Sequence, residues 1–255
     1  MIEYLIQAAA ISKSFGSGNS ARKVLNNVTV EIGAGEFTCI MGPSGSGKST
    51  LLFALSGMET VDQGVVSFNG KNLAKLTEVQ SADMHRRDMG FVFQQATLLK
   101  NLNILDNIIL PSLHDKKSSK EAILQKAKRL MNDMGIDHIA NNQISQSSGG
   151  ELQRAGICRA LMNSPKIIFG DEPTGALNSK TAQEIMKIFS DIHASGATIL
   201  LVTHDARVAA HGKRVLFMRD GAIAADQRFP HATVKSVELD HRTREIIEQM
   251  EALRI

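Results

Sequence analysis

The sequence predicts an α/β protein in which a mixed sheet carries an antiparallel β subdomain and an inserted α-helical subdomain. Three observations favour this architecture. A glycine-rich segment at 42–49 joins an apolar strand at 36–41 to a helical pattern, as in proteins with parallel sheets. Segments 4–15 and 24–32 alternate loosely between apolar and polar residues, which predicts antiparallel strands. Between residues 96 and 164 the apolar spacing becomes helical, which predicts the inserted subdomain.

The composition suits a large cytoplasmic protein. The 255 residues, 43% of them hydrophobic and 22% charged, fit one α/β domain or a core with an insertion. No apolar run reaches the roughly eighteen residues that a membrane helix needs, and the start lacks a signal-peptide pattern. The net charge of +3 is small for a nucleic-acid binder of this size. Cys39 and Cys158 lie in apolar surroundings and are expected to be buried free thiols.

The glycine-rich segment fits the pattern G-x-x-x-x-G-K-[ST] of a phosphate-binding loop. Gly45 and Gly47 permit backbone angles that a side chain disfavours, so successive N–H groups can point at an anion. Lys48 can reach the β- and γ-phosphates, the Ser49 hydroxyl can ligate Mg²⁺, and the following helix directs its positive end at the phosphates. A Gly/Ser-rich surface loop is the alternative, which the strand–loop–helix context disfavours. The residues expected to contact the nucleotide triphosphate here are Gly42, Pro43, Ser44, Gly45, Ser46, Gly47, Lys48, Ser49 and Thr50.

Two other residues of the N-terminal part are candidates for the same site. Phe15 stands just before Gly16, where its ring can stack on adenine or pack as an ordinary sheet residue. Gln94 follows an apolar strand at 89–93, so its amide can reach Mg²⁺ or an attacking water. An ordinary surface glutamine is the alternative for Gln94. Between these candidates, residues 64–70 predict a strand that ends in an Asn-Gly turn.

The helical segment contains one helix whose apolar face is expected to pack in the core, and one apolar stretch with two possible roles. Ser118 and Glu121 form an S-x-x-E capping pair, and the helix that they open ends at Gly135. Residues 97–112 are apolar and stop at Pro111. They can pack in the core or present a groove to a partner.

A second anion-binding helix start follows. Ser148 suits the N-cap of a helix that runs to Leu161, and Gly149 and Gly150 leave the N–H groups of its first turn uncovered. One nucleotide needs only one such cradle. The second therefore indicates either a second ligand or a γ-phosphate supplied by another copy of the chain.

Charged side chains follow two apolar strands at 166–170 and 197–202. Asp171 can hold Mg²⁺, and Glu172 can polarise a water for in-line attack. His204 follows the second strand, and the carboxyl ends of parallel strands face the ligand crevice. An exposed acidic turn and a structural histidine are the alternatives.

The last third of the chain predicts a helix, a hairpin and a tail. A helix at 179–195 has one apolar face, and residues 214–225 predict a hairpin around Asp220-Gly221. Within the tail, 226–255, residues 241–253 predict an amphipathic helix that docks on its own domain or on a partner, with a disordered tail as the alternative. Its apolar face is formed by Ile246, Ile247, Met250 and Leu253.

Together these motifs resemble those of the ATP-binding-cassette (ABC) ATPases over residues 1–225. They resemble, in chain order, the family's adenine-stacking loop, Walker A motif, Q-loop, signature, Walker B motif, D-loop and switch histidine. The matching positions are Phe15, Gly42 to Ser49, Gln94, Ser147 to Glu151, Asp171 with Glu172, Gly175 to Asn178, and His204. The resemblance implies a P-loop NTPase core at 1–95 and 165–225, a helical signature subdomain at 96–164 and a C-terminal helical extension at 226–255.

Two positions depart from the family pattern. Ser147 stands where the signature usually has Leu, while the Ser148-Gly149-Gly150 that touches phosphate is intact, so packing rather than chemistry should change. Asn178 stands where the D-loop usually has Asp. This change removes a charge at the dimer interface and leaves a hydrogen-bonding side chain, which bears on the coupling of two ATP sites.

The resemblance also implies a mechanism. Two copies pair head to tail around ATP and Mg²⁺, and each copy completes the other's site through Ser148, Gly149, Gly150 and Glu151. The catalytic residues implied are Glu172, which orients the water, His204 at the γ-phosphate, Lys48 and Gln94. The Mg²⁺ ligands implied are Ser49, Gln94 and Asp171.

Within the family, three stretches are similar to the branch of lipoprotein-release, macrolide-export and bacitracin-type peptide-resistance ATPases. They are Gly90 to Gln95, Asp171 to Leu177 and Thr203 to Asp205. This similarity implies a subunit that powers a transmembrane permease for export, extraction or resistance from the cytoplasmic face of the cell membrane. Segment 96–164 would receive the permease's coupling helix beside Gln94. A non-transporting signalling complex is the main alternative. A soluble ABC protein of ribosomes or DNA is disfavoured by the single cassette without heptads.

Overall fold

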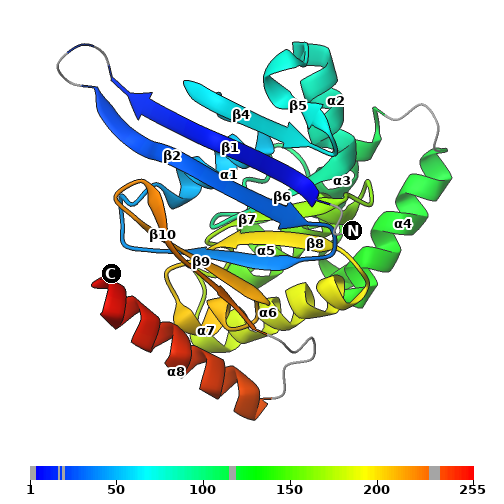
Figure 1. Ribbon diagram of the computed structural model, residues 1–255. Helices are drawn as coiled ribbons and strands as arrows, with labels where there is room; N and C mark the ends of the chain where they lie inside the picture. The colour runs from blue at the N-terminus through cyan, green and yellow to red at the C-terminus, as the bar shows by residue number, and fades with distance from the viewer. Residues whose placement is uncertain (1–3, 17, 19–20, 115–118, 230–235) are drawn as a thin grey trace.

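The computed structural model describes residues 4–16, 18, 21–114, 119–229 and 236–255. Two sheets lie at its centre with helices packed around them, which confirms the predicted mixed α/β class (Figure 1). Within these ranges, no helix is both long and apolar enough to cross a bilayer.

The first sheet is antiparallel, as predicted, with the strand order β2-β1-β4-β5. Its strands are β1 (Tyr4–Phe15), β2 (Arg22–Gly33), β4 (Gln63–Phe68) and β5 (Lys71–Asn72). The predicted Asn-Gly turn joins β4 to β5, and both Asn69 and Gly70 have the positive φ that such turns require. One face of this sheet packs on the first helix through buried side chains that include Ile6, Leu25 and Leu51.

The second sheet is mixed, with the order β10-β9-β3-β8-β7-β6. Its strands are β3 (Phe37–Met41), β6 (Met89–Phe93), β7 (Ile167–Asp171), β8 (Thr198–Val202), β9 (Arg214–Arg219) and β10 (Ala222–Arg228). Only the β9–β10 hairpin is antiparallel among the pairs described. Val202 is in register with both Ile40 and Asp171, so the carboxyl ends of β3, β8 and β7 lie side by side. This edge therefore gathers the residues that follow those strands.

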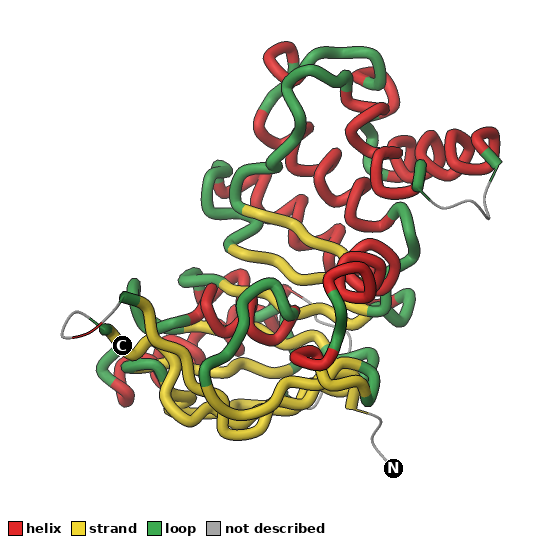
Figure 2. Tube along the Cα trace, turned by 90° about the horizontal axis from the view of Figure 1, so that it is seen from above, coloured by secondary structure: helices red, strands yellow, loops and turns green. Residues whose placement is uncertain are grey.

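Some of the helices form a lobe apart from most of the strands. Figure 2 shows a lobe made mainly of helices beside a lobe that holds most strands, and α3, α4 and α5 pack on one another. The helices are α1 (Lys48–Ser56), α2 (Glu78–Asp88), α3 (Ile104–Ile109), α4 (Lys120–Asp133), α5 (Gly149–Leu161), α6 (Ser179–Ala194), α7 (Ala206–Ala209) and α8 (Ser236–Leu253). Cys39 in β3 and Cys158 in α5 are buried free thiols, as predicted.

One helix and the start of another differ from the sequence prediction. Helix α2 has no counterpart in the predicted order, because its polar sequence buries no residue and so shows no apolar stripe. The predicted capping serine of α4, Ser118, lies outside the described residues. The N-cap is instead Ser119, whose side chain accepts a hydrogen bond from the N–H of Ala122.

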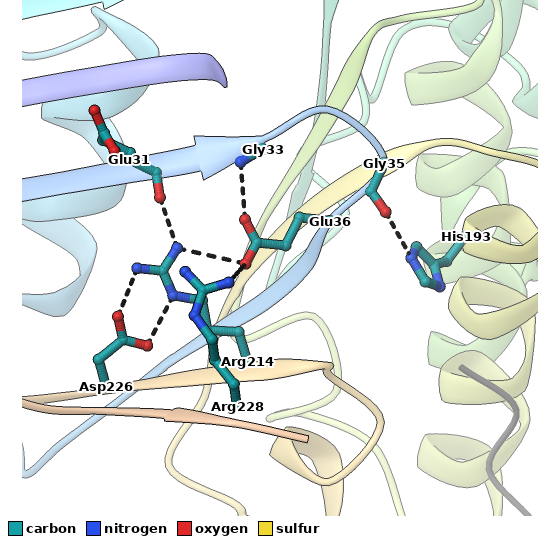
Figure 3. A network of polar contacts seen from close by, with 8 residues as sticks. All are labelled: Glu31, Gly33, Gly35, Glu36, His193, Arg214, Asp226 and Arg228. Carbon is teal, nitrogen blue, oxygen red and sulfur yellow. Dashed lines mark hydrogen bonds and ion pairs between the residues drawn. The ribbon is translucent and has the colours of Figure 1, made fainter. Parts of the chain in front are cut away.

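A buried arginine ties the two sheets together (Figure 3). Arg214 of β9 is 5% exposed, and its guanidinium donates to both carboxylate oxygens of Asp226 at 2.8 and 2.7 Å. It also donates to the carbonyl of Glu31 in β2 at 2.6 Å, and it pairs with Glu36 at the turn before β3. Arg228 contacts the same Glu36 carboxylate. Because a buried charge is tolerated only when paired, this network fixes the antiparallel sheet against the mixed one.

The tail helix α8 docks on its own chain, beside α7 (Figure 1). Ile246 is fully buried, but Ile247 is 43% exposed, so the prediction that both side chains face the protein is wrong for Ile247. Successive helical residues point about 100° apart, which explains why only one of the two is covered. Arg242 is also buried, and it donates to the carbonyls of Ala210 and Gly212 just after α7.

Candidate functional site

The phosphate-binding loop joins β3 to α1 in the predicted strand–loop–helix arrangement. Gly47 is the N-cap of α1 with φ +98°, and a methyl group at Gly47 would lie 2.6 Å from the carbonyl oxygen of Val24. A side chain at this position would therefore meet both backbone strain and a clash. Lys48 is buried in the first turn of α1 and donates to the carbonyl of Pro43 at 2.9 Å. This hydrogen bond joins the two ends of the phosphate-binding loop.

Asp171, at the end of β7, faces the start of α1. Its carboxylate accepts a hydrogen bond of 2.8 Å from the Ser49 hydroxyl. Burial raises the pKa of Asp171, and the neighbouring charge of Glu172 adds to this effect. Burial likewise lowers the pKa of Lys48, against the attraction of both carboxylates. These hard oxygen donors fit Mg²⁺, which takes one or two carboxylates together with phosphate oxygens.

Glu172 has a strained backbone and a histidine partner. Its φ is +48°, a region that costs a non-glycine residue energy and that is held here by an N–H bond of 2.9 Å to the carbonyl of Val202. Its carboxylate lies 3.1 Å from Nδ1 of His204. The two residues follow neighbouring parallel strands, β7 and β8, so the register of the sheet brings them together.

Gln94 lies near Glu172. A methyl group at Gly175 would lie 2.9 Å from Nε2 of Gln94 and 3.2 Å from Oε2 of Glu172, so both side chains converge on the turn that follows β7. The N–H of Gly175 closes that turn by donating to the carbonyl of Glu172. Gln153 of α5 donates to the carbonyl of Phe93, the residue before Gln94, at 2.9 Å. This bond connects the helical lobe with the end of β6.

Phe15 ends β1, and its ring is 44% exposed. The Nζ of Lys13 lies 5.2 Å from the ring centroid, over one face. Phe15 pairs across the hairpin with Arg22 of β2, and the Arg22 guanidinium extends to the phosphate-binding loop. A methyl group at Gly45 would lie 3.7 Å from its Nη2. Arg22, the cross-strand neighbour of Phe15, thus reaches the loop.

Helix α5 begins with a complete capping box. The Ser148 hydroxyl accepts from the Glu151 N–H, while the Glu151 carboxylate accepts from both the N–H and the hydroxyl of Ser148 at 2.7 Å. His138 approaches the same carboxylate at 3.1 Å. This helix start borders a cavity of about 490 Å³ whose lining includes Ser148, Gly149, Gly150, Glu151, Asn178 and Glu184.

Both departures from the family pattern lie near this helix start: Ser147 directly precedes it, and Asn178 lines the same cavity. The hydroxyl of Ser147 is buried and has no hydrogen-bond partner within the described part of the chain. Asn178 is the N-cap of α6, and its side-chain oxygen accepts from the N–H of Thr181 at 3.0 Å. An aspartate would cap this helix in the same way, so Asn178 keeps the local structure and changes only the charge.

The predicted site residues form two groups. At the carboxyl edge of the mixed sheet lie the phosphate-binding loop, Gln94, Asp171, Glu172 and His204. Phe15 lies apart from them at the end of β1, across the hairpin from Arg22. The second group, Ser148 to Glu151, lines a cavity whose lining contains no residue of the loop. The bonds of Gln153 and His138 have no signal in the sequence, because each joins residues that only the fold brings together.

Comparison with known proteins gives one family. The family model described as "ABC transporter" matches residues 25–175. A macrolide export ATP-binding/permease protein of Mannheimia succiniciproducens is 39% identical over 227 residues, covering 89% of this chain and 35% of the relative. An uncharacterized ABC transporter ATP-binding protein of Methanocaldococcus jannaschii, MJ1508, is 39% identical, covering 86% of this chain and 97% of the relative. The chain spans about a third of the length of the macrolide export proteins that it matches.

Solved structures give the same result. A dimeric post-hydrolysis state of the ATP-binding cassette MJ0796 with ADP and Pi aligns with a TM-score of 0.83 and 34% identity. The alignment covers 89% of this chain and 99% of the MJ0796 chain. A second dimeric structure of MJ0796, described as a bacterial ABC transporter cassette, has the same TM-score and 35% identity.

Proposed function

Because the chain belongs to the ABC transporter family as an ATP-binding cassette, we propose that it hydrolyses ATP to power a membrane permease. The transport is export, extraction or resistance, and the cargo is an antimicrobial peptide, a drug or a lipoprotein. The chain works at the cytoplasmic face of the membrane, held there by the permease. Its ATP-binding core is residues 1–95 and 165–225, its helical signature subdomain 96–164 and its C-terminal extension 226–255.

One observation carries the proposal. The chain holds two incomplete anion-binding surfaces, the phosphate-binding loop and the start of α5, and the cavity beside Ser148 includes no residue of the loop. Two copies arranged head to tail would place each Ser148–Gly150 opposite the partner's loop. ATP would then fill both surfaces at once and hold the dimer closed. The dimeric cassettes among the solved relatives support such a pair.

The geometry at the sheet edge supports the following hydrolytic roles. Lys48 and the loop amides stabilise the charge that develops on the transferred phosphoryl group. Glu172 orients the attacking water, and His204, within hydrogen-bonding distance of its carboxylate, contacts the γ-phosphate. Bound Mg²⁺ neutralises phosphate charge, and Ser49, Asp171 and Gln94 would hold it. Phe15 provides the stacking surface for the adenine ring.

The permease would dock beside Gln94. An apolar cavity of about 380 Å³ lies there, and its lining includes Gln94, Thr97, Leu98, Leu152 and Gln153. Because Gln153 bonds to Phe93, the last residue of β6 and the residue before Gln94, a displacement of Gln94 by the γ-phosphate would be passed to α5. Binding or loss of the γ-phosphate would thereby move the helical subdomain as a rigid body.

A mixing experiment tests the shared site. Lys48→Ala and Ser148→Ala chains should each lose ATPase activity, since each damages both sites of its own homodimer. In a mixed dimer, one site receives intact Lys48 and intact Ser148, so mixing should restore about a quarter of the parent activity with random pairing. Mixtures that stay as inactive as the single variants would contradict the head-to-tail site.

A further inference from the structure

Two cations flank Phe15 at the end of the β1–β2 hairpin, and they differ in their partners. Lys13 is engaged within the chain. Its Nζ contacts the Glu59 carboxylate at 2.5 Å and donates to the Thr60 carbonyl at 2.7 Å, with Asp62 at 3.7 Å. Its charge is therefore neutralised by its own surroundings.

Arg22, on the neighbouring strand, has no such partners. It is exposed and lies across the hairpin from Phe15. Within the described part of the chain, no hydrogen bond or ion pair joins its guanidinium to another residue. Its Nη2 nevertheless lies 3.7 Å from the position of a methyl group at Gly45, against the middle of the phosphate-binding loop.

The chemistry of this position favours a polyphosphate. A guanidinium presents several N–H donors in a planar fork that matches phosphate oxygens, and it stays charged at all working pH values. The loop lysine cannot take over this position, because Lys48 is buried on the inner side, where it donates to Pro43. Arg22 is therefore the cation placed to approach the loop from the hairpin side.

From this arrangement we infer that Arg22 binds the β- or γ-phosphate of the nucleotide held by the loop and so sets the preference for di- and triphosphates. The inference rests on the proposed function and deepens it. Lys23 offers a matched control, because successive strand residues point to opposite faces and Lys23 is equally exposed.

The test measures the dissociation constants of ATP, ADP and AMP by calorimetry on the full chain, in EDTA so that hydrolysis does not intervene. Arg22→Ala should weaken ATP about tenfold and leave AMP within about twofold, because AMP has neither a β- nor a γ-phosphate to receive the charged hydrogen bond. ADP should weaken with ATP if Arg22 binds the β-phosphate and should bind as it does to the parent if Arg22 binds the γ-phosphate. Arg22→Lys should recover part of the loss, and Lys23→Ala should bind all three nucleotides as the parent does.

The other outcomes separate this inference from the proposed function. Equal losses for all three nucleotides would place Arg22 at the base, the ribose or the α-phosphate, and unchanged affinities for Arg22→Ala would remove it from the site. Either result overturns the inference while ATP binding by the parent stands. A parent chain that binds none of the nucleotides contradicts the proposed function, and the inference with it.

Discussion

The phosphate-loop half of the proposed site (the loop with Asp171, Glu172 and His204) and the signature half (Ser148 to Glu151) differ in completeness. In the first, Ser49 meets Asp171 at 2.8 Å and Glu172 meets His204 at 3.1 Å. In the second, the capping box satisfies Ser148 and Glu151 internally, and the helix start opens on a cavity. One chain therefore assembles the reacting groups but leaves the complementary surface open. In the proposed head-to-tail dimer, closure of the two copies, rather than local chemistry, would then control when hydrolysis occurs.

The largest expected effect comes from a substitution in the phosphate-loop half. Glu172→Gln should keep ATP binding, trap the dimer and lower turnover by about a hundredfold or more, because an amide cannot take the proton of the attacking water. ATPase rate and molecular mass in solution with ATP measure this. Glu78→Gln, on the exposed start of α2, serves as the control. A Glu172→Gln chain as active as the parent would remove Glu172 from its role.

The second prediction concerns packing in the signature half. A methyl group at Gly150 would lie 2.7 Å from Cγ2 of Thr181, whereas one at Gly149 would lie 3.7 Å from Leu177. Gly149→Ala should gain helix propensity at little steric cost, while Gly150→Ala should be less stable than Gly149→Ala by about 1–3 kcal/mol through overpacking. Urea unfolding compares the two. Equal stabilities would show that α5 and α6 are free to separate.

A third, smaller effect distinguishes the capping hydrogen bond of Asn178 from the charge that an aspartate would add at this position. Asn178→Ala should lower the free energy of unfolding by about 1 kcal/mol, because it removes the acceptor of the Thr181 N–H. Asn178→Asp should leave that stability within a few tenths of a kcal/mol of the parent. Any change that Asn178→Asp makes in ATP-driven dimerisation, measured by sedimentation, then reports the restored interface charge alone.

The smallest expected effect is acid sensitivity at the signature half. Hydrogen bonds from the N–H and hydroxyl of Ser148 hold the pKa of Glu151 below its ordinary 4.5. A depressed carboxyl pKa contributes stability above pH 4.5, and this contribution is lost as the pH falls through the folded value. Glu151→Gln should therefore unfold with a shallower pH dependence below pH 5 in thermal melts. Parallel curves for parent and variant would contradict this coupling.

The sequence by itself was enough for the fold class, the family and the ends of most elements. The phosphate-binding loop, the Ser148 cap and the strand before Asp171 are local patterns, because backbone conformation and capping depend on a few consecutive residues. The relatives, which include macrolide export proteins, agree with the predicted branch of lipoprotein-release, macrolide-export and bacitracin-type peptide-resistance ATPases. The roles of the individual site residues stay predictions.

Tertiary structure alone decided which distant residues meet. The register of β7 and β8 joins Glu172 to His204, the bond from Gln153 reaches Phe93, and Arg22 lies beside Gly45. No periodicity signals these pairings, since they depend on strand order and on helix docking across the whole chain. Ile247 has a different reason: its side chain points about 100° around α8 from that of Ile246, and it is 43% exposed in the docked helix.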